Sequence, residues 1–200
     1  MPATFRAAVY DRHGGPEVVG LADLPLPAPG PGEVRIRLAA AGVSPIDWKL
    51  RAGLLTAHFA LPFPKIPGRD GAGVIEAVGP GVAGLPPGTL VAAFAPAAGP
   101  GGTHAEAMIA DAALTVPLPA GLAPAEAVAL AQPGLSAWIA VMRTARVRAG
   151  QRVLVQGGAG GGRRPDGAAL RGPRGRGDSG RARGQCRLRP RPRRRPRRGL

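Results

Sequence analysis

The sequence is poor in cysteine and in aromatic residues, and each shortage excludes a class of site or core. It has a single cysteine, Cys186, so the chain by itself can build neither a disulfide framework nor a thiolate metal centre. Aromatic residues make up 4% of the chain, which leaves a core of alanine, valine, leucine and isoleucine. No apolar run is judged long enough to span a membrane, and the N-terminal residues lack a signal-peptide core. We therefore expect a cytoplasmic chain without a membrane partner.

Acidic residues are also few, and the resulting positive charge is concentrated in one segment. The 200 residues carry 27 Lys and Arg against 12 Asp and Glu, a net charge of +15. Residues 163–200 alone hold 15 Arg and 2 Asp, whereas the preceding residues are nearly neutral. The basic character belongs to this tail, and the rest of the chain is typical of an ordinary cytoplasmic enzyme.

The first 120 residues alternate short apolar segments with Gly/Pro turns. Glu33–Leu38 alternates polar and apolar side chains, which is the period of a half-buried strand. Ser44 is a suitable N-cap for a short helix over 44–51, because Pro45 fits the first helical position and Asp47 the positive helix end. This pattern predicts a compact β-barrel-like unit with strands at 5–10, 17–24, 33–38, 73–79, 90–95 and 106–110.

The pattern changes after Pro119. An alanine-rich stretch over 124–146 favours helix, with a break expected at Pro133–Gly134. The run 152–155 is expected to form a buried parallel strand, and it leads directly into the glycines at 157–161. A helix, a strand and a glycine loop in this order indicate the opening of a nucleotide-binding α/β unit. The glycine loop alone is a weak signal, because Arg163 stands where the third glycine of the fingerprint is expected.

Four stretches, in order along the chain, resemble the zinc-independent, quinone oxidoreductase-like branch of the medium-chain dehydrogenase/reductase family. Residues 42–53 (GVSPIDWKLRAG) resemble its substrate-site segment, and 67–79 (PGRDGAGVIEAVG) the segment that follows. Residues 134–138 (GLSAW) resemble the linker helix beside the nicotinamide. Residues 150–161 (GQRVLVQGGAGG) resemble the first strand and the phosphate loop.

The resemblance implies a GroES-like β-barrel followed by the beginning of a Rossmann domain, and hydride transfer from NADPH to a quinone or enone. Zinc-dependent relatives carry Cys where this chain has Ser44, and His-Glu where it has Arg69 and Asp70. The histidines His13, His58 and His104 lack ligand spacing, so we expect no metal site. Direct hydride transfer needs the cofactor aimed at the acceptor more than it needs a strong acid or base.

The resemblance also assigns candidate residues, each of which has a plainer structural role as an alternative. Ser44, Asp47 and Trp48 are the candidate substrate-binding residues, although Ser44 and Asp47 also suit a helix end and Trp48 a core position. Lys49 is read as solvated and His104 as structural. No catalytic acid or base is assigned. The candidate NADPH-binding residues are Ser136, Gly157, Gly158, Ala159, Gly160 and Gly161.

The tail departs from the resemblance after about residue 161. Arg, Pro and Gly dominate residues 162–200, and such a segment buries too little apolar surface to order itself. Codons can be chosen for Arg187–Leu200 that, read one base later, encode a Leu-Gly-Ala-Asp segment like that of the family. The same shift applied to 162–168 permits the missing Val-Gly of the phosphate loop. This suggests the hypothesis of a frameshift in the glycine codons at 160–162.

The sequence thus predicts a mainly β chain with some α-helix, in three parts. Residues 1–122 form a GroES-like domain, 123–161 begin a Rossmann NADPH-binding domain, and 162–200 form a disordered basic tail. The predicted function is an NADPH-dependent quinone or enone reductase, inactive as written, and a family-typical homodimer is doubtful for such a chain. One alternative is a non-catalytic fragment whose arginine-rich tail binds nucleic acid, although the tail has no aromatics to stack on bases. Another is a catalytically dead β-domain that serves as a binding module.

Overall fold

The structure is a computed structural model, and it describes residues 3–149, 151–154 and 185–187. Contacts divide the chain into two units, Met1–Ala131 and Gln132–Leu200, and each unit is described by itself. The glycine loop at 157–161 and most of the arginine-rich tail lie outside the described residues. The phosphate-loop role and the disorder assigned to those segments therefore stay predictions, as do the domain boundaries at 122 and 161.

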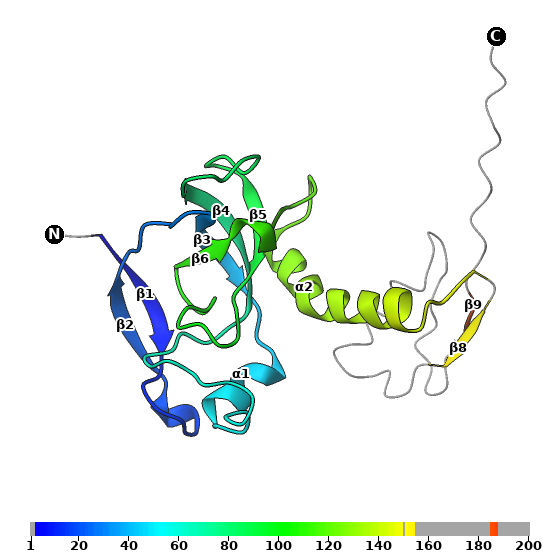
Figure 1. The fold of residues 1–200 in the computed structure, drawn as a ribbon, viewed down its shortest axis with the longest axis horizontal. Helices are drawn as coiled ribbons and strands as arrows, with labels where there is room; N and C mark the ends of the chain where they lie inside the picture. Colours follow the sequence, from blue (N-terminus) through cyan, green and yellow to red (C-terminus); the bar gives the residue numbers. More distant parts are fainter. Residues whose placement is uncertain (1–2, 150, 155–184, 188–200) are drawn as a thin grey trace, which may run out of the picture. The chain divides into compact units, whose positions relative to one another are not determined.

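The first unit is built around a five-stranded antiparallel sheet with the strand order β6-β3-β4-β5-β7 (Figure 1). The central strands β3 (Glu33–Ala41) and β4 (Asp70–Val78) pair with each other, and the pairing contains two register shifts. β5 (Leu90–Phe94) pairs with β4, and β6 (Ala107–Asp111) pairs with β3. The short strand β7 (Thr115–Pro117) pairs with β5 and follows the 3₁₀ helix η2 (Ala112–Leu114).

The alternation expected for β3 is present in the structure. Val34 and Ile36 are fully buried in the main core. Arg35 and Arg37 lie on the other face, where both guanidinium groups contact the carboxylate of Glu76 at 3.5 and 3.2 Å. Period-2 patterning thus places the apolar side chains on one face and an ion pair on the other. The same core includes Ile75, Val91 and Met108 from the three neighbouring strands.

A second, two-stranded layer consists of β1 (Thr4–Val9) and β2 (Gly20–Pro25). The amide of Ala8 donates to the carbonyl of His104 at 2.9 Å, which joins this layer to the segment before β6. The strand predicted at 17–24 is wrong in its first half, because the 3₁₀ helix η1 (Pro16–Val18) occupies that segment. Pro16 fixes a φ suited to a helical first turn, and the extended strand begins only at Gly20.

The long helix of the chain begins in this first unit. α2 (Pro124–Trp138) packs Ala127 and Val128 against Ala72 of β4 and Ala92 of β5. The break predicted at Pro133–Gly134 is wrong: the helix continues through Pro133, and a π-helix η3 (Ile139–Thr144) follows it. A proline inside a helix removes one hydrogen bond, but the alanine-rich sequence on both sides favours continued helix.

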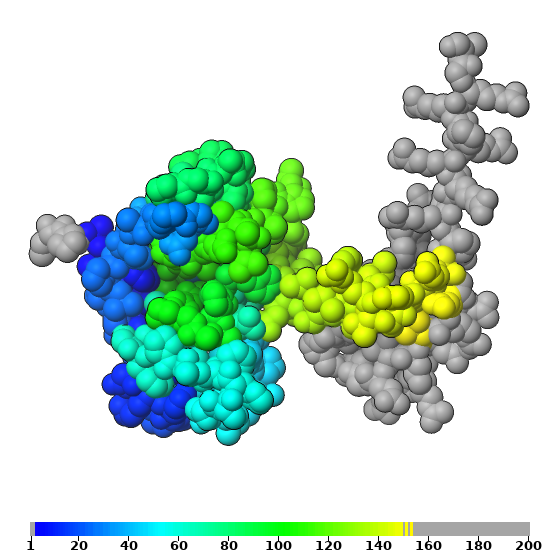
Figure 2. Space-filling model, viewed as in Figure 1, coloured from blue at the N-terminus to red at the C-terminus, as the bar shows by residue number. Residues whose placement is uncertain are grey.

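The second unit contains the end of α2, η3 and a two-stranded sheet. In Figure 2 the end of α2 and the described residues that follow it are coloured yellow-green to yellow. A strand does form near the predicted place, as β8 (Arg152–Leu154), but its partner β9 (Gln185–Arg187) is antiparallel. The expectation of parallel pairing is therefore wrong. A parallel partner requires a crossover connection, usually a helix, and the tail has lost the apolar periodicity from which such a helix is built.

Among the described residues, one helical segment is long and apolar enough to cross a membrane when judged by length and composition only. It covers Pro124–Thr144, with a mean hydropathy of 1.2 in its best window, 22% of which is buried. The expectation that no apolar stretch reaches this length is thereby corrected. Single Gln, Ser, Pro and Gly residues interrupt the run and hide it from inspection of the sequence.

Candidate functional site

The helix α1 (Pro45–Arg51) presents two of the candidate substrate residues. Ser44 has extended backbone angles at the N-cap, and its amide donates to Oδ2 of Asp47 at 2.7 Å. This is the half of a capping box in which the third helical residue reaches back to the cap. The Ser44 hydroxyl is buried and has no hydrogen-bond partner among the described residues. The predicted helix start is therefore confirmed, and the serine hydroxyl takes no part in capping the helix.

Asp47 also faces a small group of buried polar side chains from other elements. Its Oδ1 atom is buried and unpaired within the described part of the chain. Asp47, Tyr10, Lys65 and Arg69 line one cavity of about 10 Å³, which is about the space of one water molecule. Together with Asp70, we call these five residues the polar cluster. The cavity is too small to hold a quinone.

Lys65 and Asp70 are the most deeply buried ionisable groups of the polar cluster, each 3% exposed. The ammonium group of Lys65 donates to the carbonyl of Gly99 and, at 2.7 Å, to that of Gly101. Burial and the nearby Arg69 guanidinium lower the pKa of Lys65 to about 8, whereas Asp47 acts in the opposite direction. Lys65 thus holds the Gly/Pro-rich loop before β6 through two hydrogen bonds. Its surroundings also make the charged ammonium form less stable relative to the neutral amine.

Asp70 opens β4 on the other side of the cluster. Burial and the carboxylate of Asp47 raise the pKa of Asp70 above its ordinary value, against the opposing effects of a backbone hydrogen bond, Arg69 and His104. The amide of Gly42 donates to the carbonyl of Asp70 at 2.8 Å. Nε2 of His104 donates to the carbonyl of Gly42 at 2.9 Å, which agrees with the structural role expected for this histidine. The segment that leads to Ser44 is thereby held from two sides.

The remaining candidate residues lie elsewhere. Trp48 is 46% exposed, so the core role considered for it is not what the structure shows. Nζ of Lys49 lies 5.9 Å from its ring centroid, and Lys49 is exposed as expected. Ser136 is exposed on α2, in the second unit. The glycine-loop candidates at 157–161 lie outside the described residues. The structure therefore brings together Ser44 and Asp47, while the assignment of the whole set stays a prediction.

Sequence reasoning missed Tyr10, Lys65 and Thr103. Tyr10 and Thr103 are almost completely buried, and Thr103 Oγ1 is unpaired among the described residues. Burial of the aromatic ring and the nearby Asp47 raise the pKa of Tyr10. Lys65 lies between prolines in a segment expected to be a loop, and lysines in loops are normally exposed. No local pattern reveals that this loop is covered by the chain some 35 residues later.

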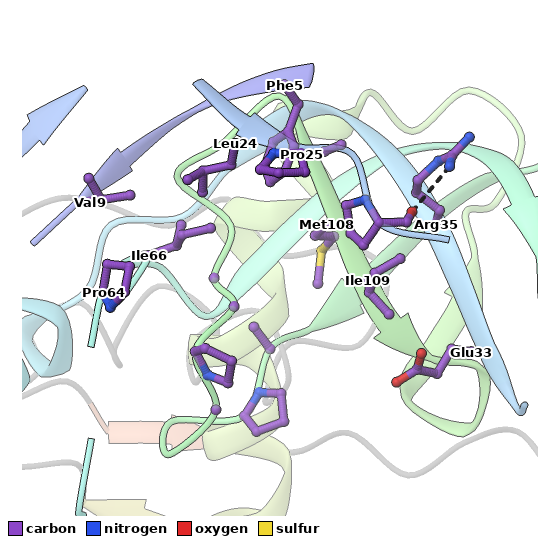
Figure 3. A pocket seen from close by; sticks show the side chains of 18 residues that line it. Phe5, Val9, Leu24, Pro25, Glu33, Arg35, Pro64, Ile66, Met108 and Ile109 are labelled. Atoms are coloured by element: carbon purple, nitrogen blue, oxygen red, sulfur yellow. Dashed lines mark hydrogen bonds between the residues drawn. The ribbon is translucent and has the colours of Figure 1, made fainter. Parts of the chain in front are cut away.

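A larger cavity of about 500 Å³ lies in the first unit, apart from α1 (Figure 3). The first strand layer contributes Phe5, Val9 and Leu24 to its lining, and Ile66 and Met108 come from other segments. At one edge, Arg35 donates to the carbonyl of Pro27 at 3.1 Å. The volume of this cavity is in the range of small-molecule pockets. None of the residues predicted from the sequence lines this cavity.

The described residues contain no group of three or more His, Cys, Asp or Glu side chains placed to hold a metal ion. Two of the three histidines have other roles. Nδ1 of His13 donates to the carbonyls of Leu50 and Arg51 at 3.1 and 3.2 Å, at the end of α1, and His104 is bonded as described above. The third, His58, is exposed.

Comparison with known proteins gives this arrangement a context. Residues 30–120 match the model of the alcohol dehydrogenase GroES-like domain. A quinone oxidoreductase from Rattus norvegicus is 40% identical over 158 residues, which is 78% of this chain and 46% of that protein. The structure of an alcohol dehydrogenase superfamily protein from Novosphingobium aromaticivorans is 38% identical, with a TM-score of 0.74, and the match covers 82% of this chain and 49% of that one.

A mycobacterial protein whose structure is described as complexed with NADPH is also similar. It is 31% identical with a TM-score of 0.64, and the match covers 73% of this chain and 43% of that chain. The chain thus spans about half the length of the relatives it matches.

Proposed function

Since the chain carries the GroES-like domain of the alcohol dehydrogenase superfamily, we propose that it derives from an NADPH-dependent quinone or enone reductase. The observation that carries the proposal is the 40% identity to a quinone oxidoreductase over 158 residues, which extends beyond the GroES-like domain. The NADPH complex of the mycobacterial relative supports the choice of cofactor. A cytoplasmic location and a small-molecule acceptor belong to the same proposal.

The substrate site in this proposal is the N-terminal end of α1. The buried, unpaired hydroxyl of Ser44 supplies a hydrogen bond to the carbonyl oxygen of a quinone or enone. Asp47 acts through Ser44, because its carboxylate holds the serine amide and so fixes the backbone that carries the hydroxyl. Trp48 offers an exposed aromatic face against which a flat acceptor can stack. The polar cluster behind α1 keeps this end of the helix in place.

The candidate residues up to the glycines at 157–161 fit an NADPH site. The hydroxyl of Ser136 is exposed, and β8 leads toward the glycines at 157–161, as a pyrophosphate loop requires. NADPH would supply a hydride to the acceptor, and these residues would bind and orient it. The residues after this glycine loop do not fit such a site, because Arg163 replaces the third glycine and the tail lacks helical periodicity. We therefore expect the chain as given to bind NADPH poorly and to catalyse no turnover.

The reaction in this proposal uses no zinc. A catalytic zinc ion typically takes three protein ligands from Cys, His or carboxylates. The positions occupied by Ser44 and Arg69 offer neither a thiolate nor an imidazole. The nearby Asp70 and Asp47 carboxylates are engaged in the polar cluster, where burial raises the pKa of Asp70 and so favours its neutral form.

The first test is to resequence the coding DNA across the codons for residues 153–200, and to express the chain in both frames. A base gained or lost in the glycine codons is the expected result. The frame-restored protein should oxidise NADPH with p-benzoquinone or methyl vinyl ketone, whereas the chain as given should not. A frame-restored protein that binds NADPH but reduces neither acceptor would refute the proposed activity.

The site assignment is then tested in the frame-restored protein. Ser44→Ala and Trp48→Ala should each raise KM for the quinone, and Lys49→Ala on the same helix is the matched control. An unchanged KM in both site variants contradicts the assignment. Salt-sensitive DNA binding by the chain as given, lost on deletion of residues 163–200, would favour the alternative of a nucleic-acid-binding fragment.

A further inference from the structure

The helical segment of the second unit carries an uncovered apolar stripe. Trp138 on α2, and Ile139 and Met142 on η3, lie three, four and seven residues after Leu135 of α2. This spacing places the four side chains on one side of the helix. Each of them is between 43% and 50% exposed. Four large apolar side chains that remain open together mark an interaction surface rather than chance exposure.

Two small or medium-sized apolar residues of the same segment are not part of the exposed surface. Ala137 and Val141 are buried, although both lie within the stretch that carries the stripe. The other exposed residues between 135 and 142, Ser136 and Ala140, are small, so the large exposed apolar side chains lie on one side of the segment. A helix that crosses a bilayer presents apolar side chains all round, whereas a helix that lies in the interface presents a single apolar face. We call these four exposed side chains the apolar stripe. Their arrangement on one side of the helix is that of a helix lying in the membrane interface.

Basic side chains follow the apolar stripe directly. Arg143, Arg146 and Arg148 are all exposed, and together with Met142 and Val147 they line a concave site of about 410 Å³. Arg146 has a φ of 49°, in the left-handed region that residues other than glycine seldom adopt. This strained backbone turns the chain within the stretch that carries the three arginines.

The charge pattern selects the occupant of this surface. No acidic residue occurs between Glu126 and Asp166. The apolar stripe and the basic site therefore lie in a stretch whose charged residues are all basic. A second copy docked on the stripe would bring two such arginine groups together, and the same stretch supplies no carboxylate to pair them. Anionic phospholipid headgroups complement the arginines, and the headgroup boundary accommodates leucine, isoleucine, methionine and the amphipathic indole of tryptophan.

We propose that residues 135–148 bind peripherally to an anionic membrane surface. The apolar stripe enters the headgroup boundary, and the arginines at 143, 146 and 148 contact lipid phosphates. The tail, with 15 further arginines, strengthens the attraction without providing the apolar contact. This departs from the expectation that the chain has no membrane partner, because that expectation considered only spanning segments.

The test uses the full chain with Trp48→Phe, which leaves Trp138 as the only tryptophan. Co-sedimentation is measured with phosphatidylcholine vesicles, alone and with about 30% phosphatidylserine, at physiological and at about 1 M salt. We expect binding only to the phosphatidylserine vesicles, a blue shift of Trp138 fluorescence on binding, and release at high salt. Arg143→Gln, Arg146→Gln and Arg148→Gln combined should weaken binding by about a hundredfold, because each basic residue near such a surface contributes about fivefold.

A pair of matched variants separates the stripe from the charge of the tail. Leu135→Gln with Ile139→Gln keeps every charge and should weaken vesicle binding by about tenfold or more. Leu130→Gln changes an equally exposed leucine of α2 that lies off the stripe, and it should bind like the parent. Any one of three results overturns the proposal. The stripe variant binds as well as the parent, the Trp138 emission does not shift, or the free chain is a dimer that only the stripe variant disrupts.

Discussion

The buried lysine of the polar cluster should make the stability of the fold depend on alkaline pH in a defined direction. Lys65 has its pKa lowered from 10.5 to about 8 in the folded chain, chiefly by burial and then by the charge of Arg69. Between these two values the unfolded chain binds a proton that the native state has released. The free energy of unfolding therefore rises with pH in this window, and the gain is lost as pH falls through 8.

The size of this effect follows from the pKa shift. A difference of this size corresponds to at most about 3 kcal/mol, and partial solvent screening around the cluster reduces the expected gain to about 1–2 kcal/mol. The chain is unusually suited to the measurement, since Lys49 and Lys65 are its only lysines and arginine does not titrate in this range. Tyr10 sets the upper end of the useful pH range. Its pKa is raised in the folded chain, so above about pH 10 the unfolded chain loses the tyrosine proton first and the free energy of unfolding falls.

The assay is chemical denaturation between pH 7 and about pH 10, comparing the parent with Lys65→Met. The parent should gain stability relative to the variant as pH rises, because every other titrating group is common to both chains. A second variant, Lys49→Arg, leaves Lys65 as the only lysine, so NMR titration of its side chain gives the pKa directly. Identical pH slopes together with a lysine that titrates near 10.5 would refute the reasoning.

Three further predictions, tested with five variants, concern the stability of other parts of the fold. Gly134→Ala should stabilise the chain by about 1 kcal/mol, because an added Cβ within α2 meets nothing within 4 Å; a loss of stability would contradict this. Asp47→Ala should cost about 2 kcal/mol, whereas Ser44→Ala should cost less than about 0.5 kcal/mol, because only the aspartate makes the cap hydrogen bond; equal costs would reverse the assignment. Gly73→Ala should prevent folding, because its Cβ would overlap the backbone of β3, whereas Gly20→Ala, which opens to free space, should fold normally; circular dichroism distinguishes the two outcomes.

The β-rich fold could be predicted because its signals are local. Alternating side chains in β3 and a Ser-Pro start for α1 each depend on a few neighbouring residues, and the structure confirms both. The GroES-like domain predicted from the resemblance is confirmed by the match over residues 30–120. Local propensity failed at Pro133, where alanine-rich flanks and packing outweigh the cost of one proline inside the helix.

The candidate site was predictable only in part, because burial is a tertiary property. The spacing of Ser44 and Asp47 identified the cap, but not the unpaired state of the serine hydroxyl. Lys65 becomes a buried charge because the carbonyls of Gly99 and Gly101 reach it from more than thirty positions away. Trp48 was as compatible with core as with surface, and only the fold shows that it is exposed.

The pairing of β3 with β6 affects how the chain can fold during synthesis. The two strands are separated by roughly 70 residues, so β3 leaves the ribosome several seconds before its partner at usual elongation rates. Contacts between distant residues also slow folding, because the entropy of closing the loop is lost before the pairing is gained. During that interval β3, with Val34 and Ile36 still uncovered, offers an open strand edge to any other nascent chain.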